Sequence, residues 1–95
     1  MNMEEQLYTI EVYSEHHVGV LHQVAMTFSR RCVNIEYLEA KPCSTAGVHK
    51  ITVVFHSSPE IMEQIVKQLE KRVDILRVSL LPNQYSGECN VSVEA

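Results

Sequence analysis

The period of the apolar pattern changes within the first third of the chain. Between residues 7 and 14 polar and apolar side chains alternate, which is typical of a strand with one buried face. The next apolar residues, Leu21, Val24, Ala25 and Phe28, are spaced to share one face of a helix. We therefore predict a strand at 7–14 and a helix at roughly 18–31. Arg30 and Arg31 fall in its last turn, where cations interact favourably with the helix dipole, so we expect them to cap it.

Two segments rich in strand-forming residues follow this helix. Residues 33–41 run up to Pro42, whose fixed φ and missing N–H disfavour further pairing. Residues 51–55 form a β-branched run that ends in Phe55. The small polar residues 43–47 lie between the two segments and favour a hairpin with a longer loop.

A second helix is predicted to begin near residue 58. Serine at 58 suits the N-cap, Pro59 suits the first helical position, and Glu60 places a carboxylate in the first turn. Apolar residues then recur four apart, at Ile61, Ile65 and Leu69. The segment 73–81 is predicted to be a fourth strand, because apolar residues alternate in it at Leu76, Val78 and Leu80.

The resulting element order, βαββαβ, indicates the α+β class. The ferredoxin-like arrangement of this order is one four-stranded antiparallel sheet with both helices on a single face. We expect this domain to span residues 6–81. Residues 82–95 are expected to form a polar tail, in which Val91 and Val93 are spaced for a short edge strand.

Composition limits the classes of function. The chain of 95 residues is 45% apolar and carries a formal net charge of -4, which gives no electrostatic footprint for a nucleic-acid backbone. The 49–55 segment has one aromatic residue, whereas an RNA-recognition strand carries a platform of stacking aromatics. We therefore expect no nucleic-acid partner.

The sequence also predicts a cytoplasmic protein with no membrane partner. No apolar run approaches the ~20 residues needed to span a bilayer, and the first five residues lack the basic and apolar pattern of a signal peptide. The three cysteines, Cys32, Cys43 and Cys89, are widely spaced, which favours reduced thiols over a disulfide framework or a zinc site.

The loop before the first helix contains a histidine pair, His16 and His17, with His22 nearby. Imidazoles bind zinc or nickel, so a histidine-based metal-binding module is an open alternative. Its geometry is poor, because adjacent residues seldom point the same way and no carboxylate or thiol at ligand spacing completes the set. No catalytic constellation or phosphate-binding glycine loop appears either. We expect a non-catalytic protein with no cofactor and no metal.

Gly19 opens the first helix without a side chain over its first turn. The unpaired N–H groups of a helix start and the positive end of its dipole suit a carboxylate. Beside Gly19, the apolar residues Val18, Val20 and Leu21 suit an aliphatic side chain. The ligand that matches both features is a small amino acid, although a glycine that merely makes a turn is the alternative.

Several motifs together resemble one family. They are Leu7-Tyr8-Thr9-Ile10-Glu11-Val12, Gly19-Val20-Leu21, Phe28-Ser29-Arg30-Arg31, Asn34-Ile35-Glu36 and the helix from Glu63 to Leu69. This set is similar to the ACT domain of the small regulatory subunit of acetolactate (acetohydroxyacid) synthase. The resemblance covers residues 6–81. It implies a non-catalytic subunit that binds and activates the large catalytic subunit and lets a branched-chain amino acid, typically valine, inhibit it.

The resemblance also implies a site shared by two chains. In such families two sheets join across a dimer, and the effector lies between the first loop and helix of one chain and the second strand of the other. Gly19, Val20 and Leu21 would then hold the backbone end of the effector, and Asn34 with Ile35 would approach from the partner. The family loop is usually Asn-x-Pro-Gly; here His16 and Val18 take the asparagine and proline positions.

An imidazole at His16 can still donate one hydrogen bond to the effector. A second hypothesis remains open beside the acetolactate synthase subunit, namely a stand-alone amino-acid-sensing ACT protein that regulates another enzyme or a transcriptional partner. A response to an amino acid without any effect on acetolactate synthase would identify it.

Overall fold

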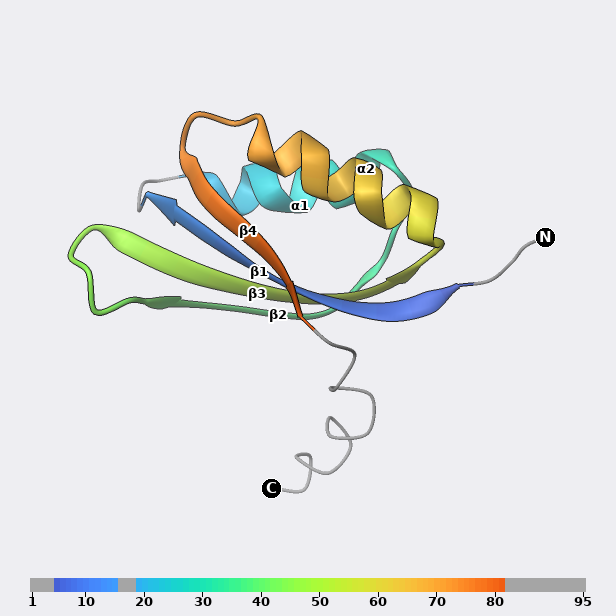
Figure 1. Cartoon of the computed structure of the whole chain (residues 1–95), viewed down its shortest axis with the longest axis horizontal. Coiled ribbons are helices and arrows are strands. Elements are labelled where there is room, and N and C mark those ends of the chain that lie inside the picture. Colours follow the sequence, from blue (N-terminus) through green and yellow to red (C-terminus); the bar gives the residue numbers. More distant parts are fainter. Residues whose placement is uncertain (1–4, 16–18, 82–95) are drawn as a thin grey trace, which may run out of the picture.

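Four strands and two helices follow one another in the order predicted from the sequence (Figure 1). The computed structural model describes residues 5–15 and 19–81. The elements are β1 (Gln6–Glu15), α1 (Val20–Arg30), β2 (Ile35–Pro42), β3 (Val48–Ser57), α2 (Pro59–Glu70) and β4 (Ile75–Leu81). The tail at 82–95, with its predicted edge strand, lies outside the described residues.

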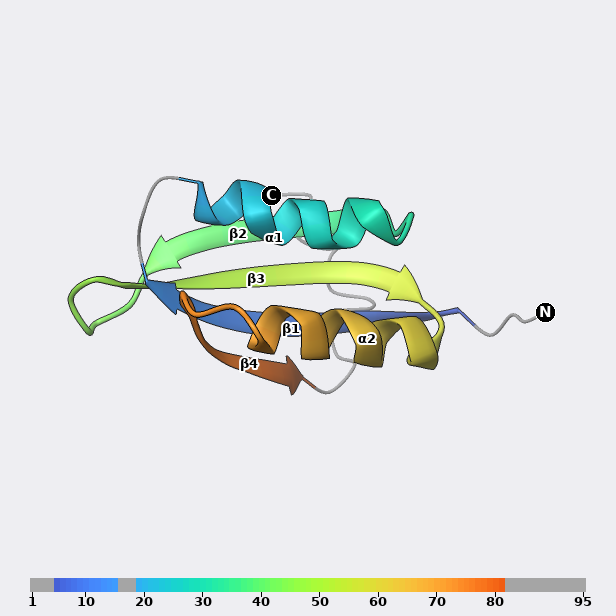
Figure 2. The same ribbon diagram turned by 90° about the horizontal axis from the view of Figure 1, so that it is seen from above.

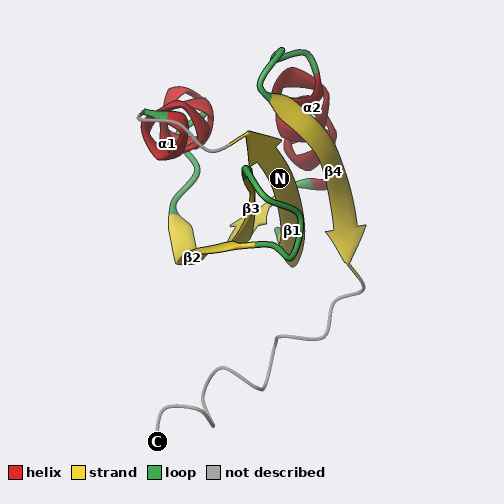
Figure 3. Cartoon of the chain, turned by 90° about the vertical axis from the view of Figure 1, so that its left-hand side faces the viewer, coloured by secondary structure: helices red, strands yellow, loops and turns green. Residues whose placement is uncertain are grey.

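The strands form one antiparallel sheet in the order β2-β3-β1-β4. Both helices cover the same face of this sheet, as Figure 3 shows, which confirms the predicted ferredoxin-like arrangement. Seen from above, α1 lies over the β2 side and α2 over the β4 side (Figure 2). The strands β1 and β3 are central, whereas β2 and β4 each leave one edge of the sheet open among the described residues.

Strand register decides which side chains meet the helices. Ile10 stands opposite Val53 and Val12 opposite Ile51, and all four side chains are fully buried. Residues opposite one another in an antiparallel pair share a face, so this face of the sheet supplies the core. The helices contribute the remaining large apolar side chains, and Phe28 of α1 meets Phe55 of β3 edge-on with ring centroids 4.9 Å apart.

Element boundaries differ from the predictions where tertiary pairing takes over. Strand β3 extends over 48–57 rather than 51–55, because it pairs with β1 on one side and β2 on the other. Strand β2 begins at Ile35 and ends at Pro42, which is its last residue and stands in register with His49. Proline is tolerated there because β2 is an edge strand, whose outer N–H positions need no partner in the sheet.

The end of α1 is closed by its own backbone. The N–H of Val33 donates to the carbonyl of Phe28, and the N–H of Cys32 donates to that of Ser29, which together form a Schellman motif. Cys32 has a φ of 59°, in the left-handed region where glycine is the usual residue. The backbone thus satisfies carbonyl groups at this helix end, and Arg30 lies in the last turn, where a cation suits the negative end of the dipole as predicted.

The start of α2 confirms the signals seen in the sequence. The hydroxyl of Ser58 accepts a hydrogen bond from the N–H of Ile61 at 3.3 Å, and Pro59 occupies the first helical position. Within 5–15 and 19–81 neither helix has the length and apolar character needed to cross a membrane.

Candidate functional site

The start of α1 differs from that of α2 in having no side-chain cap. Gly19 occupies the N-cap position with φ 93°, and its carbonyl accepts the first helical hydrogen bond, from Gln23 N–H at 3.0 Å. The N–H groups of Val20, Leu21 and His22 precede that bond and have no acceptor within the helix. Since the first turn also lacks an acidic residue, these donors and the positive end of the dipole suit a carboxylate.

Glycine is favoured at position 19 by backbone conformation and not by crowding. A Cβ built on Gly19 would meet nothing within 4 Å, but its φ is one that L residues rarely adopt. Gly47, in the β2–β3 turn, is in the same situation with φ 81° and an open surrounding. The two glycines therefore place similar backbone demands on the chain at two distant points.

The side chains beside Gly19 play different parts. Val20 is only 5% exposed and belongs to the core, so only its backbone N–H faces the helix start. Leu21 is 41% exposed and is the apolar side chain that this turn offers to a ligand. His16 and Val18, which the sequence also assigns to the site, lie outside the described residues.

Asn34 and Ile35 lie at the other end of α1. The helix has 11 residues, which at 1.5 Å per residue separates the two ends by about 16 Å. Asn34 is exposed, whereas Ile35 is partly buried against the core. One chain therefore does not bring Asn34 to Gly19, and the predicted residues form two separate groups.

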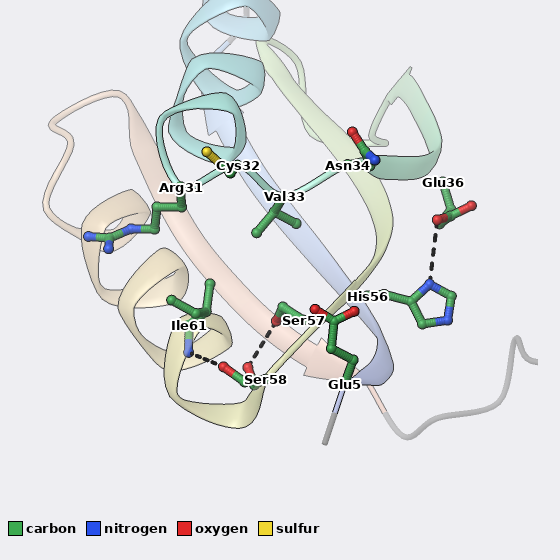
Figure 4. A pocket seen from close by; sticks show the side chains of 10 residues that line it. All are labelled: Glu5, Arg31, Cys32, Val33, Asn34, Glu36, His56, Ser57, Ser58 and Ile61. Carbon is green, nitrogen blue, oxygen red and sulfur yellow. Dashed lines mark hydrogen bonds and ion pairs between the residues drawn. The ribbon is translucent and has the colours of Figure 1, made fainter. Parts of the chain in front are cut away.

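A pocket of about 370 Å³ lies where Asn34 is found, between the end of α1 and the start of α2 (Figure 4). Val33 and Ile61 point toward each other inside it. Its polar groups mostly pair with protein: Nδ1 of His56 lies 3.4 Å from a Glu36 carboxylate oxygen, and the Ser57 hydroxyl donates to the Ser58 carbonyl at 2.9 Å. These contacts stabilise the junction of the elements and leave the Asn34 amide at its rim.

Arg31 joins the two helices at this end of the molecule. Its guanidinium donates to the side-chain carbonyl oxygens of Gln64 at 2.6 Å and Gln68 at 3.1 Å, both on α2. No local pattern predicts these contacts, because the partners are 33 and 37 residues away in the chain. Arg31 is the C-cap residue of α1, and its side chain in addition connects α1 to α2.

The face of the sheet without helices carries paired charges and no catalytic arrangement among the described residues. Nζ of Lys50 lies 3.5 Å from the Glu11 carboxylate, which raises the pKa of the lysine. The hydroxyl of Tyr13 donates to the same carboxylate at 3.1 Å. In the described ranges no three histidine, cysteine or acidic side chains are grouped to hold a metal ion. The metal hypothesis depends on the pair His16 and His17, which lies outside the described residues.

Comparison with known proteins decides the family. Residues 10–77 match the family described as the AHAS (acetohydroxyacid synthase) small subunit-like ACT domain. The chain belongs to this family. The match includes both ends of α1, and it confirms the resemblance seen in the sequence motifs.

Relatives of this ACT domain are named as small subunits. The chain is 36% identical over 78 residues to a probable acetolactate synthase small subunit of Methanothermobacter thermautotrophicus, covering 82% of this chain and 46% of that protein. It is 42% identical over 67 residues to the acetolactate synthase small subunit of Bacillus subtilis, covering 70% and 39%. The chain thus spans about half or less of the length of these relatives.

A solved structure supports the fold of the ACT domain. The acetolactate synthase small subunit from Thermotoga maritima superposes with a TM-score of 0.75 at 23% identity, over 85% of this chain and 50% of that chain. At this identity the likeness concerns the fold alone. The four-stranded sheet with two helices on one face is therefore shared with a small-subunit structure.

Proposed function

We propose that this ACT domain is the amino-acid-sensing part of a non-catalytic regulatory subunit of acetolactate synthase. In this role it binds and activates the large catalytic subunit in the cytoplasm and carries the inhibitory signal of a branched-chain amino acid. The observation that carries the proposal is the start of α1, where Gly19 leaves helix N–H donors without a side-chain cap. Membership of the small-subunit family supports the assignment of this helix start to a regulatory subunit.

The proposed effector is a small aliphatic α-amino acid such as valine. Its carboxylate would bind the N–H groups at the start of α1, where the helix dipole favours negative charge. Its side chain would contact Leu21, which is 41% exposed, and Val18. The imidazole of His16 would donate a further hydrogen bond from the loop.

The second half of the site would come from another copy of the chain. Gly19 and Asn34 lie at opposite ends of α1, so they meet only if two α1 helices run antiparallel around a two-fold axis. Pairing of two β2 edges in antiparallel fashion gives this geometry and joins the two sheets into one. Asn34 and Ile35 of the second copy then approach the effector bound at Gly19.

Exposed apolar side chains support β2 as the dimer edge. Tyr37 is 44% exposed and Leu38 is 39% exposed, although both lie on a regular strand. An open strand edge with apolar side chains is prone to pair with another strand, and a homodimer hides it. In the proposed homodimer the interface would thus lie on the side of the sheet opposite β4.

The proposal is tested by mixing the protein with the catalytic subunit of acetolactate synthase and adding valine. We expect activity to rise on mixing and to fall again with valine, and a calorimetric titration of the isolated protein to show valine binding. Valine binding without any effect on the synthase would support a stand-alone sensor instead. If the protein neither bound valine nor activated the synthase, both hypotheses would be refuted.

The dimer edge is tested by placing a charge on it. Leu38→Glu is expected to convert the protein to monomer and to lower valine affinity about tenfold or more, because the second half of the site is lost. Sedimentation velocity measures the first effect and titration the second. Leu76→Glu, on a leucine of the opposite edge strand that is 52% exposed, should leave the dimer intact. Equal behaviour of the two variants would argue against β2 as the interface.

A further inference from the structure

The strand β4 ends the sheet on the side away from β2. It pairs with β1 through one edge, and its other edge has no strand beside it among the described residues. Such an edge presents a row of backbone N–H and C=O groups, which proteins usually protect with charges, proline or a covering segment. β4 has one charged residue, Arg77, in the sequence Ile75–Leu81.

The side chains of β4 also suit a further strand. Leu76 is 52% and Leu80 is 48% exposed, and Val78 between them is partly buried. Val78 stands opposite Val12 and Leu80 opposite Ile10, so these two side chains face the helix layer at its outer margin, whereas Leu76 lies at the irregularity between Arg77 and Ile75. Arg77 and Ser79 form the opposite row, with the Arg77 guanidinium carbon 5.1 Å from the centre of the Tyr13 ring. The outer edge is therefore apolar on one face and polar on the other.

The same alternation occurs later in the chain, at residues 90–94, which read Asn-Val-Ser-Val-Glu. These residues lie outside the described ranges. Eight residues, 82–89, separate them from β4 and include Pro82 and Gly87, which favour a turn. A connection of this kind can bring the segment back beside the strand it has just left, as in a hairpin with a long loop.

One register satisfies both faces. If Val91 stands opposite Leu80, antiparallel pairing places Ser92 opposite Ser79, Val93 opposite Val78 and Glu94 opposite Arg77. A slip of one residue would turn both valines to the polar face. A slip of two in either direction would separate Glu94 from Arg77, and a slip toward Ile75 would also move the pairing into the irregularity between Arg77 and Ile75.

We propose that residues 90–94 pair antiparallel with the outer edge of β4 as a fifth strand, with Val91 opposite Leu80 and Glu94 opposite Arg77. The occupant of this edge is thus a segment of the same chain, identified by its apolar alternation and its charge. The guanidinium can keep its stacking on Tyr13 and still bind the carboxylate through its edge, because its donors lie in one plane. This inference is independent of the proposed sensing function.

Disulfide trapping tests the register directly. In a protein with all three native cysteines changed to serine, Ser79→Cys with Ser92→Cys should form an intrachain disulfide under mild oxidation. The control pair, Ser79→Cys with Val91→Cys, places its thiols on opposite faces and should form it about tenfold less, since disulfides need close and correctly directed Cβ atoms. Mass spectrometry of the non-reduced protein measures both. Equal yields from the two pairs, or disulfides mainly between chains, would overturn the proposal.

Charge reversal provides a second measurement. Arg77→Glu and Glu94→Arg should each speed amide exchange at the outer edge of β4, by about threefold, whereas the double variant should restore it, because only the pairing is common to the two sites. Removal of residues 82–95 should speed the same amides further. Unchanged exchange in the shortened chain would show that the segment does not cover β4 and would refute the inference.

Discussion

The two helices of this ACT domain begin in opposite ways. At the start of α2 the hydroxyl of Ser58 accepts the Ile61 N–H and Glu60 complements the dipole, so the helix satisfies its own first turn. At the start of α1 Gly19 supplies neither a side-chain acceptor nor a charge. Both helices fold against the same sheet, so packing does not explain the difference. The capped start of α2 needs no further partner, whereas the donors at the start of α1 are left for water or for the proposed effector.

The largest expected effect comes from giving α1 a carboxylate of its own. Gly19→Asp should lower valine affinity by about 100-fold, because a carboxylate held at the helix start competes with that of the effector and repels it. Titration calorimetry measures the loss. Folding should survive, because aspartate tolerates the left-handed region better than most residues.

Gly47→Asp is the matched control for this variant. Its φ of 81° and its open surrounding resemble those of Gly19, so the two substitutions carry a similar backbone cost of about 1 kcal/mol. Both also add one negative charge. We expect Gly47→Asp to bind valine within about twofold of the unmodified protein. If both variants lost binding alike, net charge or general destabilisation would be the cause, and the start of α1 would have no special role.

Removal of the side-chain cap at the start of α2 should lower stability without changing valine affinity. Ser58→Ala removes the acceptor of the Ile61 N–H and should lower the free energy of unfolding by about 1 kcal/mol. Urea denaturation measures this, with Ser29→Ala as a control, since that serine is exposed inside α1 and its loss should change stability by less than about 0.5 kcal/mol. Valine affinity should be unchanged in both. A loss of affinity in Ser58→Ala would contradict the division between the two helix starts.

Local signals account for what the sequence predicted well. Ser58, Pro59 and Glu60 stand side by side in the chain, so the start of α2 could be identified without knowing what packs against it. The alternation through Ile10 and Val12 likewise needs only a sheet with one buried face. The order of elements and the ACT resemblance followed from such short-range patterns, and both are confirmed.

Contacts between distant segments could not be predicted in the same way. Arg31 has the position of a capping residue, yet its guanidinium reaches Gln64 and Gln68 because α2 happens to lie beside it. The meeting of Gly19 with Asn34 stays a prediction, since about 16 Å of helix separates them and a second chain must bring them together. The loop residues His16 and Val18 remain sequence-based assignments as well. The part of the site that depends on tertiary or quaternary structure is the part that sequence patterns do not encode locally.

The smallest expected effect concerns the far end of α1, where the comparison with Gly19 continues. Cys32 also lies in the left-handed region, but it carries a side chain there. Relief of that conformation is worth about 1–2 kcal/mol, and the extra freedom of glycine in the unfolded chain costs about 0.5–1 kcal/mol. Cys32→Gly should therefore raise the free energy of unfolding by about 0.75 kcal/mol, the difference between the midpoints of these two ranges.

Cys43→Gly separates this backbone effect from the loss of a thiol. Cys43 is the other described cysteine, and among the described residues Cys32 alone combines a side chain with a positive φ. Replacement of Cys43 by glycine should lower the free energy of unfolding, because only the entropic cost of glycine remains. Urea denaturation of the two variants should thus give changes of opposite sign. If both variants were less stable than the unmodified protein, the contacts of the Cys32 side chain would outweigh its backbone strain. This end of α1 would then be stabilised by side-chain contacts.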